Sequence, residues 1–219
     1  MMYRSIRGLG LFTLLSLGIS LGAQAALVAP TNSIDGLNLN WSKSESNTLQ
    51  AFDENQNISI KSDSINVDYL MGENLNVGQS FTGVNRSNSG LYLKEGTYSS
   101  QLLHFDPLGT KRGQIQNARF EFTDSIVAII LGGEYLRLSD YLLGNANTLY
   151  DTSSSRRMET NDFFTLESSN TLLVDKVSVG RYWTDDVRII TQKVSEPSSW
   201  AIFGLGLLGL VGARKIAKQ

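Results

Sequence analysis

The 219-residue sequence predicts an all-β fold, an antiparallel β-sandwich, with a jelly-roll-like arrangement or closed barrel as the alternative. Three observations favour this class. Many short segments alternate apolar and polar residues, which is the side-chain period of a half-buried strand. Turn signals separate these segments roughly every eight to twelve residues. In the body of the chain, apolar residues have helical spacing in one short segment, so classes built on helices fit poorly.

Five strands are predicted in the first half of the body, over residues 37–41, 58–61, 65–69, 91–94 and 97–105. Leu37, Leu39 and Trp41 share one face of the first strand, with asparagines on the other. Residues 95–96, Glu-Gly, are predicted to form a two-residue hairpin turn between the last two strands. Pro107 cannot donate to a β-ladder and is expected to stop the fifth strand.

The second half continues this pattern, with strands predicted over residues 114–122, 126–131, 163–166, 171–179 and 186–191. The run 126–131 is entirely apolar, which fits a strand buried on both faces at the centre of the core. One short helix over residues 134–143, ending at Gly144, is predicted from three residues at helical spacing: Tyr135, Leu138 and Leu142. Residues 145–161 are polar and are predicted to form a loop.

The N-terminus has the form of a secretory signal. Two arginines precede an apolar run over residues 8–21, and Ala23 and Ala25 give the small-x-small site that signal peptidase requires. The run is shorter than the roughly 20 residues of a membrane-spanning helix, which disfavours a permanent anchor. Residues 1–25 are therefore predicted to be a signal peptide.

We expect signal peptidase to cleave after Ala25, because the small-residue site there follows a basic, apolar leader. N-terminal sequencing of the exported protein should then begin at Ala26. An exported protein that still begins at Met1 or Met2 would show that the leader is retained.

The last stretch of the chain, residues 195–219, has three parts in order. Ser195, Glu196 and Pro197 form a short acidic-proline motif. An apolar, glycine-punctuated segment, predicted to form a short transmembrane helix, follows over about residues 200–213. The chain closes with a basic group: Arg214, Lys215 and Lys218.

This order of parts resembles the PEP-CTERM signal of Gram-negative bacteria, a tail also known as the ice-binding protein C-terminal domain. Ser195 stands where that signal usually has its first proline. The resemblance implies that an exosortase-type membrane transpeptidase recognises Glu196 and Pro197 and releases the body or transfers it to the cell envelope. These two residues are then recognition residues, and the protein is the substrate.

The apolar segment of the tail is short for a bilayer. Its fourteen residues, 200–213, extend roughly 21 Å at about 1.5 Å per residue, against a hydrocarbon core of about 30 Å. Spanning therefore requires local thinning or snorkelling of the basic side chains. The positive-inside tendency keeps the basic group in the cytoplasm and the body outside. We predict transient anchoring in the inner membrane, followed by delivery to the cell surface or exterior.

Residues 26–194, the predicted secreted domain, contain 14 Lys and Arg and 20 Asp and Glu, so their net charge is 14 − 20 = −6. This balance provides no basic face for phosphate contacts and argues against nucleic acid as a partner. The chain has no cysteine, so an oxidising compartment adds neither a disulfide nor thiol chemistry.

Groups for catalysis are few in this domain. His104 is the single histidine, and without cysteine it has no partner for a transition-metal site and no accompanying nucleophile motif. The carboxylate pairs Asp53-Glu54 and Asp185-Asp186 are neighbours along the chain, so in strands their members point to opposite faces. Neither pair would flank one glycosidic bond by itself. We therefore predict that the protein is not an enzyme.

Binding is the remaining chemistry. Carboxylates and loop carbonyls could hold Ca²⁺, which accepts six to eight oxygens, although no Asp-x-Asp-x-Asp-Gly loop is present. Arg156 and Arg157 follow three serines and are predicted to lie in a solvated loop. Five aromatic residues could form a platform for sugar stacking, or belong to the core and rim of a sandwich: Trp41, Tyr92, Tyr98, Tyr182 and Trp183.

Stretches of the body, among them residues 102–107 and 186–191, also resemble the bodies of secreted PEP-CTERM proteins of unassigned activity. From tail and body together we predict an exported cell-envelope or extracellular-matrix protein with a structural or surface-interaction role, in an environment where polysaccharide is a potential partner. The alternative is a carbohydrate-binding or glycosidase-like secreted protein.

Overall fold

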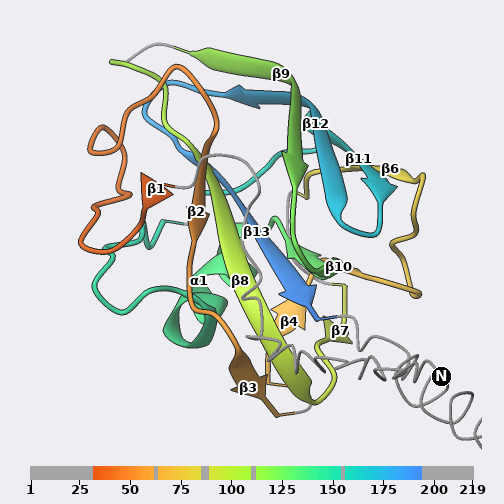
Figure 1. The fold of residues 1–219 in the computed structure, drawn as a ribbon. Coiled ribbons are helices and arrows are strands. Elements are labelled where there is room, and N and C mark those ends of the chain that lie inside the picture. Colours follow the sequence, from red (N-terminus) through yellow and green to blue (C-terminus); the bar gives the residue numbers. More distant parts are fainter. Residues whose placement is uncertain (1–31, 62–63, 85–88, 110–111, 154–155, 194–219) are drawn as a thin grey trace, which may run out of the picture.

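The computed structural model describes residues 32–61, 64–84, 89–109, 112–153 and 156–193. Two β-sheets pack face to face in this part of the chain, and one short helix lies on the outer side of the larger sheet (Figure 1). The predicted antiparallel sandwich is confirmed, and the two sheets remain separate instead of closing into a barrel.

The larger sheet has the strand order β1-β2-β8-β13-β10-β5, and β3 pairs with β8 beyond the end of β2. Its strands are β1 (Asn32–Ser33), β2 (Gln50–Asp53), β3 (Ile58–Ile60), β5 (Tyr69–Leu70), β8 (Gly96–Phe105), β10 (Ser125–Ile130) and β13 (Asp185–Gln192). All of its strand pairs are antiparallel except β1 with β2.

The smaller sheet has the order β6-β11-β12-β9, and a separate two-stranded ladder joins β4 and β7. The strands of the smaller sheet are β6 (Ser80–Thr82), β9 (Gly113–Glu121), β11 (Phe163–Ser168) and β12 (Thr171–Val179). The ladder consists of β4 (Asn66–Val67) and β7 (Leu91–Tyr92).

The main core lies between the two sheets, because successive side chains of a strand point to opposite faces. Val187 and Ile189 of β13 belong to the same buried cluster as Phe164 of the smaller sheet. β10 is the predicted strand buried on both faces: Ile129 contacts this cluster, and Ile130 contacts a second cluster that includes residues of the helix. The prediction of a strand with buried residues on both faces is confirmed, although Val127 is only partly buried.

The helix α1 (Gly133–Leu143) confirms the helix predicted over residues 134–143, but the face that it buries differs from the predicted face. Leu138, predicted to be on that face, is 51% exposed. Gly144 ends the helix, as predicted, and a Cβ there would lie 2.6 Å from the carbonyl oxygen of Asp140, so the close approach requires glycine. The side chains that α1 buries are Tyr135, Leu136, Ser139 and Leu143.

The predicted strand over residues 37–41 is wrong. Asn38 makes only an isolated parallel bridge to Leu149, and its side-chain oxygen accepts a hydrogen bond from the Asn40 amide (3.1 Å), which turns the chain. Leu39 is fully buried all the same. Leu37 and Trp41 are half-buried, like Asn38 and Asn40, so the alternation in the sequence does not correspond to two faces of a strand.

Two further predictions in this half are corrected. The hairpin at residues 95–96 is wrong, because β7 pairs with β4 whereas β8 pairs with β2, β3 and β13. The strand over residues 65–69 is divided at Asp68, whose Oδ2 accepts hydrogen bonds from the amides of Leu131 and Gly132, both at 2.8 Å. β4 and β5 on either side of it therefore pair with different strands.

Candidate functional site

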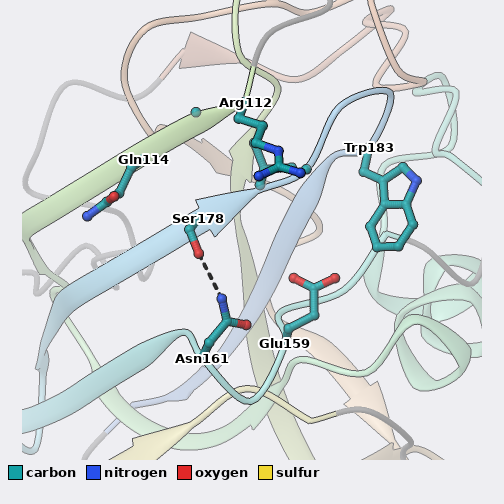
Figure 2. Close-up of a pocket in the computed structure, with 9 residues that line it drawn as sticks. Arg112, Gln114, Glu159, Asn161, Ser178 and Trp183 are labelled. Carbon is teal, nitrogen blue, oxygen red and sulfur yellow. Dashed lines mark hydrogen bonds between the residues drawn. The ribbon is translucent and has the colours of Figure 1, made fainter.

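A surface pocket of about 460 Å³ opens at one end of the smaller sheet, where β9 begins and β12 ends (Figure 2). The turn before β11 and the connection from β12 to β13 complete its wall. It combines an indole ring, two amides, a hydroxyl and two charges of opposite sign. The side chains that contribute these groups are Arg112, Gln114, Glu159, Asn161, Ser178 and Trp183.

The side chains of the pocket come from different elements but converge (Figure 2). Arg112 and Glu159 point toward the middle of the pocket, and the Trp183 ring stands at its side. Asn161 Nδ2 donates a hydrogen bond to Ser178 Oγ (3.0 Å), which links the turn before β11 to β12. Trp183 is 41% exposed, so its ring can contact a ligand.

Two local features shape the pocket. At Gly113, the first residue of β9, a Cβ would lie 2.4 Å from Pro107 Cγ, so the close packing requires glycine. Tyr182 has a φ of 66°, a conformation that is uncommon for a non-glycine residue. Its ring makes an edge-on contact with Trp41 at 5.1 Å between ring centroids. This contact holds the turn that presents Trp183.

The structure assembles only part of the predicted aromatic platform. The ring of Trp41 contacts the ring of Tyr182, the residue that precedes Trp183 in the chain. Tyr98 is 5% exposed and belongs to the cluster that includes α1. Tyr92 is exposed but lies on β7, at the opposite end of the sandwich from the start of β9 (Figure 1). Sugar stacking on all five rings together is therefore ruled out by their positions.

An acidic cluster of Glu159, Asp162 and Asp185 borders the pocket. Glu159 is the member of this cluster that lines the pocket wall. One carboxylate oxygen of each residue lies within 4.8 Å of those of the other two. The Asp162 carboxylate is fixed by backbone amides: Glu159 N donates to Oδ2 (2.7 Å) and Ser178 N donates to Oδ1 (2.8 Å). Asp185 enters from the first residue of β13, in the other sheet.

Asp185 is the most deeply placed member of the acidic cluster. It is fully buried, and neither of its carboxylate oxygens has a hydrogen-bond partner among the described residues. Burial, and then the charges of Asp162 and Glu159, raise the pKa of Asp185 well above its ordinary value. Burial is also the main cause that raises the pKa of Glu159 and of Asp162. The cluster thus brings three carboxyl groups together where burial disfavours their charged forms.

A buried ionic network occupies the other face of β13, between the larger sheet and α1. Its six members are Glu54, His104, Asp140, Arg156, Asp186 and Arg188. Arg188 forms two parallel bonds to Glu54, Nε to Oε2 and Nη2 to Oε1, both 2.7 Å. Asp140 of α1 joins the two arginines, with Oδ1 at 2.9 Å from Arg188 and Oδ2 at 2.6 Å from Arg156.

The second half of this network is built around Asp186. Arg156 Nε lies 2.6 Å from its Oδ2 and His104 Nδ1 lies 2.6 Å from its Oδ1. Burial alone would raise the pKa of Asp186, but Arg156 and His104 outweigh it, so the net shift is downward and the carboxylate is held as an anion. His104 is fully buried here, in a structural position.

The prediction that Arg156 and Arg157 lie in a solvated loop is wrong for the first of them. Arg156 is fully buried, and its guanidinium lies 5.2 Å from the centre of the Tyr150 ring. Arg157 is half-buried. Arg156 therefore connects the segment before β11 to the larger sheet through its ion pair with Asp186, although the local sequence predicted an exposed side chain.

Asp185 and Asp186 point to opposite faces of β13, as predicted. Asp185 joins the acidic cluster, and Asp186 joins the buried ionic network. The sequence did not single out Glu159 and Asp162, whose spacing of three residues is common in turns. The one signal that pointed to this region was the Asp-Asp pair itself.

The predicted signal-cleavage and sorting residues lie outside the described residues: Ala23, Ala25, Ala26, Ser195, Glu196, Pro197, Arg214, Lys215 and Lys218. Among the helices formed by the described residues, none combines the length and the apolar composition that crossing a bilayer requires.

Comparison with known proteins identifies a family for one segment of the chain. No curated protein and no solved structure matches the chain. Residues 193–215 match the PEP-CTERM protein-sorting motif, and the body has no further family match. The motif indicates export and sorting at a membrane by an exosortase-type system. This chain therefore carries a PEP-CTERM sorting motif behind a β-sandwich body, as its sequence predicted.

Proposed function

We propose that this protein is an exported surface or matrix protein whose sandwich binds a neutral saccharide in the pocket of Figure 2 without hydrolysing it. The sorting motif supports the destination. The observation that carries the binding role is the exposed Trp183 ring beside amide and guanidinium groups in one pocket.

The groups of the pocket match the two kinds of surface that a pyranose presents. Its C–H face is apolar and packs on an aromatic ring, which Trp183 offers. Its hydroxyls both donate and accept, and the amides of Gln114 and Asn161 do the same. Such sites typically combine an apolar wall with a few placed polar groups.

Charge favours a neutral ligand over an acidic one. Residues 26–194 have a net charge of −6, which repels anionic polymers. Within the pocket, Arg112 is balanced by Glu159. A neutral glycan approaches this surface without electrostatic cost.

The carboxylates of the region favour binding over hydrolysis. A glycosidase places two carboxyl groups on either side of the bond that it cuts. Glu159 is the one carboxylate among the side chains that line the pocket. Asp162 accepts backbone hydrogen bonds with both oxygens, and Asp185 is fully buried, so neither is positioned to reach a sugar in the pocket.

Replacement of Trp183 with alanine tests the proposal. We expect binding to neutral glycans, measured by pull-down on insoluble polymers and by titration with soluble oligosaccharides, to weaken about fivefold, because a stacked ring contributes on the order of 1 kcal/mol. Tyr141→Ala is the matched control, since Tyr141 is 88% exposed on α1, outside the pocket. Equal binding by Trp183→Ala and the unaltered protein would refute the pocket as the binding site.

A hydrolysis assay on the same glycans tests the non-catalytic part of the proposal. We expect no release of reducing ends above a blank. Turnover that is abolished by Glu159→Gln would establish an enzyme instead.

A further inference from the structure

The oxygens of the acidic cluster are spaced to share one cation. Because one carboxylate oxygen each of Glu159, Asp162 and Asp185 lies within 4.8 Å of the other two, a point exists no more than about 2.8 Å (4.8 Å divided by √3) from all three. Ca²⁺ binds oxygen at about 2.3–2.6 Å and tolerates irregular geometry, whereas Mg²⁺ demands about 2.0–2.1 Å in a strict octahedron. This upper limit lies close to the Ca²⁺–oxygen distance and well above the Mg²⁺–oxygen distance, so the spacing favours Ca²⁺.

A second observation points to a ligand. Asp185 is fully buried, its carboxylate takes part in the cluster, and both of its oxygens have no hydrogen-bond partner among the described residues. A buried carboxylate without a partner carries a large desolvation cost, which a bound cation would offset. In the part of the chain that the structure describes, no Lys or Arg forms an ion pair with any of the three carboxylates.

The site is also built on fixed elements. Asp162 is held by the amides of Glu159 and Ser178, and Asp185 is paired with Phe105 in the ladder between β13 and β8. Glu159 opens to the pocket, which gives a cation its route of entry and gives water the remaining coordination positions (Figure 2).

We propose that Glu159, Asp162 and Asp185 bind one Ca²⁺ ion between the two sheets, at the inner side of the pocket. Three carboxylates from the turn before β11 and from β13 bind the ion, and water from the pocket completes its shell. The ion joins the smaller sheet to the larger one at this end of the sandwich. The inference does not depend on saccharide binding, so either proposal can be refuted while the other stands.

Thermal unfolding of the full chain, purified in detergent, tests the site. With CaCl₂ about 100-fold above its dissociation constant, we expect a melting temperature about 5–10 °C higher than in EGTA. MgCl₂ at the same concentration should give a clearly smaller shift. An identical melting temperature in CaCl₂ and EGTA, together with no heat of binding in a calorimetric titration with CaCl₂, would overturn the proposal.

The variant Asp185→Asn tests whether the ion binds at the acidic cluster. Asp35→Asn, at an exposed position, is the matched control. The Asp185 variant should lose the Ca²⁺-induced shift, and the control should keep it. If Asp185→Asn fails to fold, Glu159→Gln at the pocket wall replaces it and should weaken Ca²⁺ binding at least about tenfold. A Ca²⁺ response that survives either variant at full size would place the ion elsewhere and overturn the assignment.

Discussion

Replacement of Arg188 with methionine is expected to destabilise the protein by about 3–5 kcal/mol. The guanidinium is fully buried and satisfies both oxygens of Glu54, which is itself 6% exposed. Without it, Glu54 keeps only the hydroxyls of Ser100 and Tyr150 as donors among the described residues. Urea denaturation monitored by tryptophan fluorescence measures the change in the free energy of unfolding.

Two further variants separate the network from general damage. Arg188→Met combined with Glu54→Gln should recover a large part of the loss, because removing both charges also removes the cost of burying the unpaired carboxylate. Arg119→Met is the surface control: Arg119 lies 2.7 Å from Glu167 but its side chain is 57% exposed, so no measurable change is expected. If Arg188→Met is as stable as the unaltered protein, the network does not stabilise the fold.

Truncation after Val194 is expected to move the exported body almost completely from the membrane fraction to the soluble fraction. The truncation removes the PEP-CTERM motif with its apolar segment, while every described strand is retained. Fractionation of cells and medium, followed by detection of the body with an antibody, measures the redistribution. A truncated chain that still sediments with membranes would show that the body itself binds them.

A variant with Glu196→Gln and Pro197→Ala separates processing from anchoring. It keeps the apolar segment and the basic group, so we expect it to stay with the membrane at full length. Processing at the rate of the unaltered protein would show that an exosortase-type enzyme does not depend on these two residues.

The sequence predicted those elements whose signal is local. β10, β12 and α1 were expected close to their observed bounds, since β12 and α1 carry their own periodicity and β10 is a continuous apolar run. The pairing of β8 was missed, because its neighbours β2 and β13 come from opposite ends of the body. β2 and β6 were missed as well, because the two apolar residues of β2 are adjacent and β6 has a single apolar residue, so neither strand alternates.

The candidate site was predictable only in fragments. The divergence of Asp185 from Asp186 follows from the two-residue period of a strand, and it was foreseen. The convergence of Asp185 with Glu159 and Asp162 depends on how two sheets are packed, which no local pattern encodes. The burial of Arg156 was mispredicted for the same reason, since its partners Asp140 and Asp186 lie on other elements.

β13, the last strand of the body, lies in the middle of the larger sheet, between β8 and β10. Only two residues separate its final residue, Gln192, from Ser195 at the start of the tail. In a chain exported from its N-terminus, the sheet stays open along a central seam until β13 has crossed the membrane, and pairings of such long sequence separation are slow to form. We therefore expect the sandwich of such a chain to close only when the tail has arrived, so that folding and sorting coincide.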